Sequence, residues 1–274
     1  ADNSLCDYAD NPIVILVTSA LIILGGIGYI VWWDIIRVVK ERKLKKGNWF
    51  RRITLHSKIS LVSTVVLLFV GTLLFLALEY DNANTLGTLS FPQKLMAAFF
   101  QSVTTRTAGF AAIPQESFTN ASAIVSLLLM FIGGSPVGTA GGIKTVTFTV
   151  LLATAVSAVK NKNDVTMFGR TLSREAVRKA LAVCFTSFSI VFISSVLLCA
   201  ATGASVLDVL YECVSACATV GLTRGITPTL GVLGKLIITA TMYFGRVGPI
   251  SLAIAFNVKK ESQNIIKNPV EDIS

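Results

Sequence analysis

The sequence predicts an all-α polytopic membrane protein, and three observations predict it: the composition, the long apolar runs and an internal repeat. Hydrophobic residues make up 53% of the 274 residues and charged residues only 14%. The mean hydropathy is +0.71. Soluble domains carry about 25% charged residues. Several apolar runs also reach the length of about 20 residues that a helix needs to cross a bilayer.

The internal repeat relates segments that lie 112 residues apart. Thr-Ala-Gly-Phe at 107–110 recurs as Thr-Val-Gly-Leu at 219–222, and Met-Phe-Ile-Gly at 130–133 recurs as Met-Tyr-Phe-Gly at 242–245. Each copy places a short Thr-x-Gly element before an apolar segment that contains glycine. Repeated units of this kind predict a pore in which backbone carbonyls replace the hydration shell of a monovalent cation.

The first predicted span runs from Pro12 to about Trp33, and proline suits the first turn of a helix. The glycine cluster at 25–28 indicates a thin or bent stretch within it. Residues 37–58 follow, with nine Lys or Arg against one acid, as expected of a cytoplasmic loop. His56, the only histidine, lies in this segment and is interpreted as a surface residue.

The second predicted span covers about 59–78, and the acidic residues after it indicate the external side. The apolar stretch 91–104 is too short to cross a bilayer and predicts a re-entrant helix. The third span begins near Ala121, is interrupted at 133–142, and resumes over 145–159.

The second half repeats this order. A basic loop at 160–179 precedes the fourth span at about 181–201, a second short apolar stretch at 206–216, and the fifth span at about 233–258. With the first residues outside, both basic loops and the C-terminal tail face the cytoplasm of a multi-pass plasma-membrane protein. The net charge of +9 therefore belongs to these short loops, which argues against a nucleic-acid partner.

The Thr-x-Gly elements suit the coordination of a dehydrated potassium ion, which needs about six to eight oxygens. Glycine permits the left-handed backbone that aims successive carbonyls at an axis. A single copy is typical of a plain turn between helices, whereas two copies in the same context favour a filter. The residues expected to supply carbonyls are Thr107, Ala108, Gly109, Ala218, Thr219, Val220 and Gly221.

Four segments of the chain carry a specific resemblance: 99–110, 133–145, 218–222 and 245–249. Through them the chain resembles the membrane subunit of the Ktr/Trk potassium-uptake family. It implies four membrane-helix/pore-loop/membrane-helix units around a cation pore, with one glycine of each unit lining a single filter. It also implies homodimeric membrane subunits and a cytosolic ring of nucleotide-binding subunits that regulates them. Potassium would be the transported ion, sodium an activator or co-ion as in a symporter, and no organic cofactor is implied.

The chain departs from that pattern because it holds only two complete repeats. We interpret 1–58 as the last helix of a preceding repeat with a basic loop, 59–175 as a complete repeat, and 176–274 as the final repeat with a tail. The sequence is therefore expected to be the C-terminal portion of a longer transporter or a truncated product. A smaller departure is Ala218, which stands where a glycine often precedes the last filter element.

The interruption at 133–142 holds five glycines within a span. Irregular backbone at that depth is tolerated only where protein covers it or water lines it. By resemblance it is an intramembrane gating loop, and a passive kink is the alternative. The expected gate consists of Gly133, Gly134, Ser135, Gly138, Gly141, Gly142, Lys144 and Arg246.

Other charged residues have structural or undecided roles. Arg106 is expected to brace the first filter element, and Glu212 is a candidate partner for Arg106 or Arg224. The five cysteines read as small apolar packing residues. An enzyme is not indicated, because the sequence has neither an HExxH nor a GxSxG motif. A membrane scaffold, or a truncated non-conducting fragment, that binds a cytosolic regulatory subunit remains the alternative function.

Overall fold

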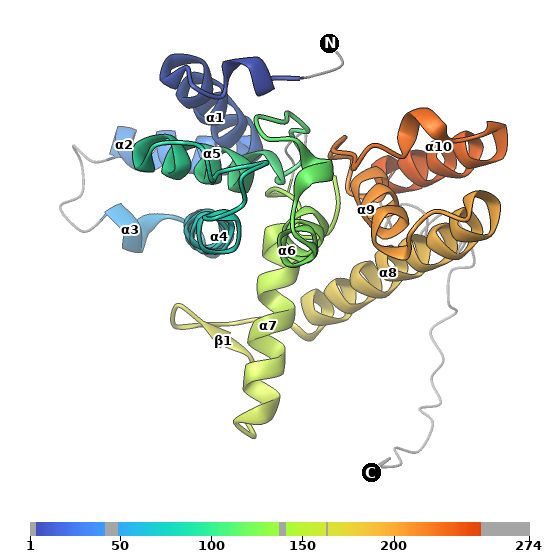
Figure 1. The fold of residues 1–274 in the computed structure, drawn as a ribbon. Helices are drawn as coiled ribbons and strands as arrows, with labels where there is room; N and C mark the ends of the chain where they lie inside the picture. Colours follow the sequence, from blue (N-terminus) through green and yellow to red (C-terminus); the bar gives the residue numbers. More distant parts are fainter. Residues whose placement is uncertain (1–3, 42–48, 137–140, 163, 248–274) are drawn as a thin grey trace, which may run out of the picture.

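The computed structural model describes residues 4–41, 49–136, 141–162 and 164–247 (Figure 1). These segments are mostly helical. The α-helices are α1 (Pro12–Gly26), α2 (Tyr29–Lys40), α3 (Trp49–Arg52), α4 (Leu55–Glu79), α5 (Phe91–Thr104), α6 (Asn120–Phe131), α7 (Thr145–Val159), α8 (Arg174–Thr202), α9 (Val206–Cys217) and α10 (Val232–Val247). Short 3-10 turns lie at Cys6–Tyr8, Gln115–Ser117 (η3) and Thr227–Thr229, and β1 (Thr166–Met167) pairs with β2 (Arg170–Thr171) in a small antiparallel hairpin.

Helices α4 and α8 are each long and apolar enough to cross a membrane. Helices α1 and α2 pass the same test together, but they are bent by 87°. The bend coincides with the predicted glycine cluster, where Gly28 adopts a φ of 85°. Helices α6 and α7 are the two shorter apolar halves of the predicted broken span. Helix α10 starts the predicted fifth span, of which 248–258 lie outside the described residues.

The two short predicted helices, α5 and α9, lie inside the helix assembly. Helix α5 packs on α1 and α4, whereas α9 packs on α6, α8 and α10. In Figure 1, α1 to α5 lie on one side, α8 to α10 on the other, and α6 and α7 between them. Gly71 allows the close packing of α4 on α5, because a methyl group there would overlap the side chain of Ser102. Neither short helix is long enough to cross a bilayer, which fits the prediction of re-entrant helices.

The first basic segment differs from the continuous loop expected at 37–58. Helix α2 extends to Lys40, and α3 and the first turn of α4 occupy part of the remainder. The reason is local capping: the Thr54 hydroxyl accepts a hydrogen bond from Ser57 N, and Asp34 accepts bonds from Thr54 N and Oγ1. His56 is consequently half-buried in α4, so its interpretation as a surface residue was wrong.

Candidate functional site

The two Thr-x-Gly elements share one backbone conformation. Thr107 and Gly109 have φ angles of 68° and 76°, and Thr219 and Gly221 have φ angles of 55° and 95°. A left-handed threonine is rare because its β-branched side chain crowds the backbone. The two copies of the repeat therefore share a backbone conformation as well as a sequence pattern, because the threonine and the glycine of each copy both have a positive φ.

Each element is tied back to the helix that precedes it. Ala108 N donates to Thr104 O over 3.1 Å, and Val220 N donates to Ser215 O over 2.8 Å. Gly221 N donates to the Ser215 hydroxyl over 3.1 Å. Within the part of the chain that the structure describes, no backbone N–H donates to the backbone oxygens of Thr107, Ala108, Gly109, Ala218, Thr219, Val220 or Gly221. The main chain therefore leaves these oxygens without a backbone donor.

The two elements lie directly beside each other. A methyl group on Gly109 would overlap the carbonyl oxygen of Val220, and one on Gly221 would lie 3.9 Å from the Gly109 Cα. The structure thus brings together two tripeptides that are more than one hundred positions apart in the chain. Only glycine at 109 permits this approach.

The two ends of the glycine-rich interruption between α6 and α7 lie side by side. Ile132 and Ile143 form a parallel bridge, in which Gly133 N donates to Ile143 O over 2.9 Å. Next to this bridge, Thr145 N donates to Gly134 O over 3.1 Å. The described part of the interruption is consequently a loop with joined ends rather than a kink in a continuous helix.

This loop packs against the threonine side of both Thr-x-Gly elements. A methyl group on Gly141 would overlap the Thr219 side chain, and one on Gly133 would lie 3.5 Å from Thr107 Cγ2. A methyl group on Gly142 would lie 3.2 Å from the Ala218 Cβ. Gly138, also expected in the gate, lies outside the described residues. The glycines that contact the two Thr-x-Gly elements, Gly133, Gly141 and Gly142, come from both ends of the loop.

Ser135 anchors the loop to the rest of the molecule. Its side chain is fully buried, and its Oγ lies 2.5 Å from Ser60 Oγ of α4 and 3.3 Å from Thr145 Oγ1. Its backbone N donates to Gly26 O over 3.0 Å, at the bend between α1 and α2. Two neighbouring interrupted helices therefore meet at this serine.

The two cations expected near the gate lie close to each other. Lys144 is the residue before α7, and Arg246 lies in the last turn of α10. The two residues are near enough for the charge of Arg246 to act on Lys144, although 102 positions separate them in the sequence. Positive charge therefore gathers at one end of the loop.

The other charged residues settle a question that the sequence left open. Arg224 pairs with Asp208 over 2.7 Å rather than with Glu212. Glu212 instead accepts hydrogen bonds from the hydroxyls of Thr223 and Thr227. Arg106 is buried and donates to the hydroxyl of Thr64 over 3.2 Å, which agrees with a bracing role.

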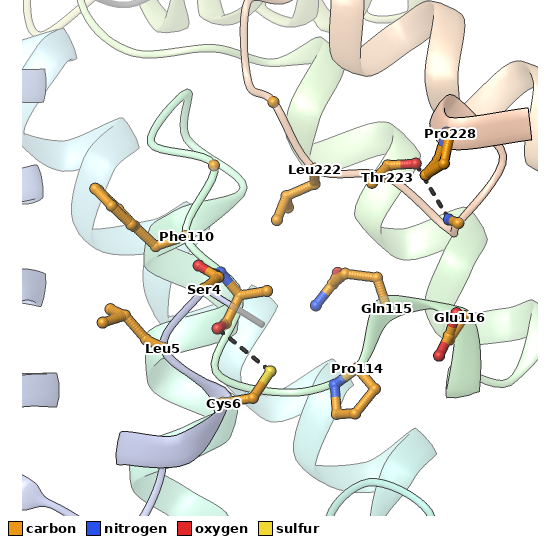
Figure 2. Close-up of a pocket in the computed structure, with 14 residues that line it drawn as sticks. Ser4, Leu5, Cys6, Phe110, Pro114, Gln115, Glu116, Leu222, Thr223 and Pro228 are labelled. Atoms are coloured by element: carbon orange, nitrogen blue, oxygen red, sulfur yellow. Dashed lines mark hydrogen bonds between the residues drawn. The ribbon is translucent and has the colours of Figure 1, made fainter. Parts of the chain in front are cut away.

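A cavity of about 790 Å³ opens on the glycine side of the two elements. Residues of three segments line it, 4–6, 109–116 and 221–228, and Gly109 and Gly221 are among them (Figure 2). One of these segments, 4–6, was not singled out in the sequence; Leu5 N donates to Ala111 O over 2.9 Å and so fixes it beside the first element. The cavity and the loop thus lie on opposite sides of the paired Thr-x-Gly elements.

Comparisons with known proteins identify the family of the chain. The family model described as "TrkH: Cation transport protein" matches residues 1–268. The chain is 40% identical to the Ktr system potassium uptake protein B of Bacillus subtilis, over 96% of this chain and 57% of that protein. It is 39% identical to the potassium/sodium uptake protein NtpJ of Enterococcus hirae, over 99% of this chain and 59% of that protein.

Among solved structures, the potassium transporter TrkH from Vibrio parahaemolyticus matches with a TM-score of 0.75 at 18% identity. The match covers 94% of this chain and 54% of that chain, and it shows a common fold. The chain therefore spans less than two thirds of the length of these curated relatives and of this structural match.

Proposed function

Because this chain belongs to the TrkH family of cation transport proteins, we propose that it supplies two filter elements and a gate to a potassium-uptake pore of the bacterial plasma membrane. The observation that carries the proposal is the pair of adjacent Thr-x-Gly elements with the same left-handed alternation. Their backbone oxygens accept no hydrogen bond from a backbone N–H of the described residues. Neutral carbonyls of this kind replace the water around a potassium ion without adding charge.

In the proposed mechanism, the ion enters through the cavity and loses water between Gly109 and Gly221. It then passes the carbonyls toward Thr107 and Thr219, where the loop at 133–142 obstructs the path. Support comes from the contact of Gly141 with Thr219 and from the joined ends of the loop. The positive charges of Lys144 and Arg246 would oppose a cation in this position until the loop moves.

Finer features of the proposal come from the family and from one relative. A relative whose name includes potassium and sodium supports stimulation by sodium. We further propose a homodimer with the first residues outside and the C-terminus in the cytoplasm. A cytosolic ring of nucleotide-binding subunits would then regulate the pore through the basic cytoplasmic segments, of which 160–179 is one.

The test is potassium uptake in a bacterial strain that lacks its own potassium-uptake systems. A chimera would place the N-terminal part of the Bacillus subtilis relative before residues 1–274, and the chain alone would be expressed beside it. We expect the chimera to restore uptake, more strongly with sodium present, and Gly109→Ser to weaken its affinity for potassium. Uptake by the chain alone would mean that two copies build one pore. A chimera that inserts and binds a cytosolic regulator without flux would favour the scaffold alternative.

A further inference from the structure

A buried polar cluster lies behind the two filter elements and connects the two repeats. Gln101 belongs to α5, Tyr211 to α9, and Gln115 to the 3-10 turn η3 that follows the first filter element. Their exposed fractions are 1%, 0% and 4%. Polar side chains at this depth are retained only where their hydrogen bonds are satisfied, so the bonds of this cluster define its geometry.

Gln115 is the centre of the cluster. Gln101 Nε2 donates to Gln115 Oε1 over 2.8 Å, and Gln115 Nε2 donates back to Gln101 Oε1 over 3.1 Å. Gln115 Nε2 also donates to Ile113 O over 2.8 Å. The Tyr211 hydroxyl donates to the same Gln115 Oε1 over 2.9 Å. One amide oxygen therefore accepts bonds from the pore helices of both repeats.

A second connection reaches the backbone of Gln115 from the final repeat. Arg224 Nη1 donates to Gln115 O over 3.1 Å, while Arg224 Nε is paired with Asp208 over 2.7 Å. The final repeat thus holds Gln115 both from its pore helix and from the loop after its filter. Figure 2 shows Gln115 on the wall of the cavity, beside Pro114 and Glu116 of its own segment.

The residue at the equivalent position of the final repeat makes a different set of bonds. Thr227 lies 112 residues after Gln115, and its hydroxyl donates to Glu212 of its own pore helix over 2.5 Å. A bond from this position to the helix of the same repeat is therefore common to both units. Of these two positions, Gln115 is the one that, within the described residues, is also bonded to the pore helix of the other repeat, through Tyr211.

We propose that Gln115 is a positioning residue that sets the separation of the two filter elements and thereby the selectivity of the pore among monovalent cations. The argument rests on the proposed function. Selectivity depends on the number and spacing of the carbonyls around the ion. A satisfied buried network restricts movement of the segments that it joins. Gln115 follows the first element by six residues, and Tyr211 precedes the second by eight, so a change at their bond is transmitted to both.

The test uses Tyr211→Phe and Gln115→Met in the chimera, because Tyr211→Phe removes one hydroxyl and leaves the pair of glutamines intact. The matched control is Tyr243→Phe, the same change on an exposed tyrosine of α10. The measurement is the ratio of the KM values for sodium and potassium, at equal amounts of protein in the membrane. A second measurement is the shift in thermal unfolding that potassium and sodium each cause in the purified chimera.

We expect Tyr211→Phe to lower the selectivity ratio by about threefold to tenfold, which corresponds to the loss of one hydrogen bond. The control should leave the ratio unchanged. Gln115→Met should lower it at least as much, and the double variant should equal Gln115→Met, because the tyrosine acts through that amide. Where Gln115→Met does not accumulate, Tyr211→Phe alone decides.

An unchanged ratio with reduced thermal stability in Tyr211→Phe would overturn the proposal and leave the cluster a purely structural role. The ratio in the unsubstituted chimera separates this result from a failure of the proposed function. A chimera that neither transports potassium nor gains stability from it would reject the filter, and the positioning role with it.

Discussion

Adding one methyl group to each glycine of the proposed filter should produce unequal effects on potassium affinity. Gly109 and Gly221 both have positive φ angles, of 76° and 95°, so alanine at either position would have a strained backbone. This strain costs roughly 1–2 kcal/mol per residue. The two positions differ in their surroundings: the new methyl would overlap the Val220 carbonyl oxygen at 109, whereas at 221 it would lie 3.9 Å from the nearest atom.

Relief of the overlap at Gly109 requires the second filter element to move, and overpacking of this kind costs about 1–3 kcal/mol more. The total is then roughly 2–5 kcal/mol for Gly109→Ala against roughly 1–2 kcal/mol for Gly221→Ala. Since about 1.4 kcal/mol corresponds to a tenfold change, the KM for potassium should rise by up to about 30-fold for Gly221→Ala and by at least about 30-fold for Gly109→Ala.

The assay is the concentration dependence of potassium uptake by the chimera. Gly169→Ala is the matched control, because Gly169 has a φ of 73° in the β1–β2 hairpin and its added methyl would meet no atom within 4 Å. It has the same backbone strain far from the filter and should leave the KM unchanged. Equal effects at Gly109 and Gly221, or a larger effect at Gly221, would refute the reasoning.

Deleting 135–141 should raise potassium flux, because this loop packs on the threonine side of the filter elements; unchanged flux would indicate a passive loop. Glu79→Gln should lower the thermal stability by about 2 kcal/mol without changing the KM, since the carboxylate accepts hydrogen bonds from several neighbours, including Thr119 N and Oγ1. Unaltered unfolding would contradict that role. Burial alone would raise the pKa of Asp208, but hydrogen bonds from Arg224 and Ser205 and the charge of Arg224 hold it below the usual 3.8. This contribution to stability is therefore present above pH 3.8 and lost as the pH falls through the lowered pKa. The difference in unfolding temperature between the unsubstituted chain and Asp208→Asn should accordingly shrink below about pH 4, and a constant difference would speak against the ion pair.

The length of each apolar run was enough to predict most helices. The short stretches 91–104 and 206–216 became α5 and α9 with nearly the same bounds. The interruption at 133–142 was also visible, because glycine and proline are poor helix formers at any position in the interior. These features depend on neighbouring residues, which a sequence shows directly.

Features that depend on distant residues could not be predicted. Asp208 and Glu212 both lie within reach of Arg224 by sequence, and only the path of the loop after the second filter assigns the ion pair to Asp208. The bond from Tyr211 to Gln115 joins residues 96 positions apart, and neither residue type marks a network by itself. Likewise, the glycines at 25–28 indicated a bend but not its size, which is 87°.

The bridge between Ile132 and Ile143 has a consequence for the speed of opening. A loop whose two ends are hydrogen-bonded to each other can move as a unit while the helices that flank it stay in place. Because Ser135 is fully buried and bonded to α4 and to Gly26, movement of the loop must first break these contacts, and it would fall in the range of about microseconds to seconds that is typical of lid opening rather than in that of an exposed loop.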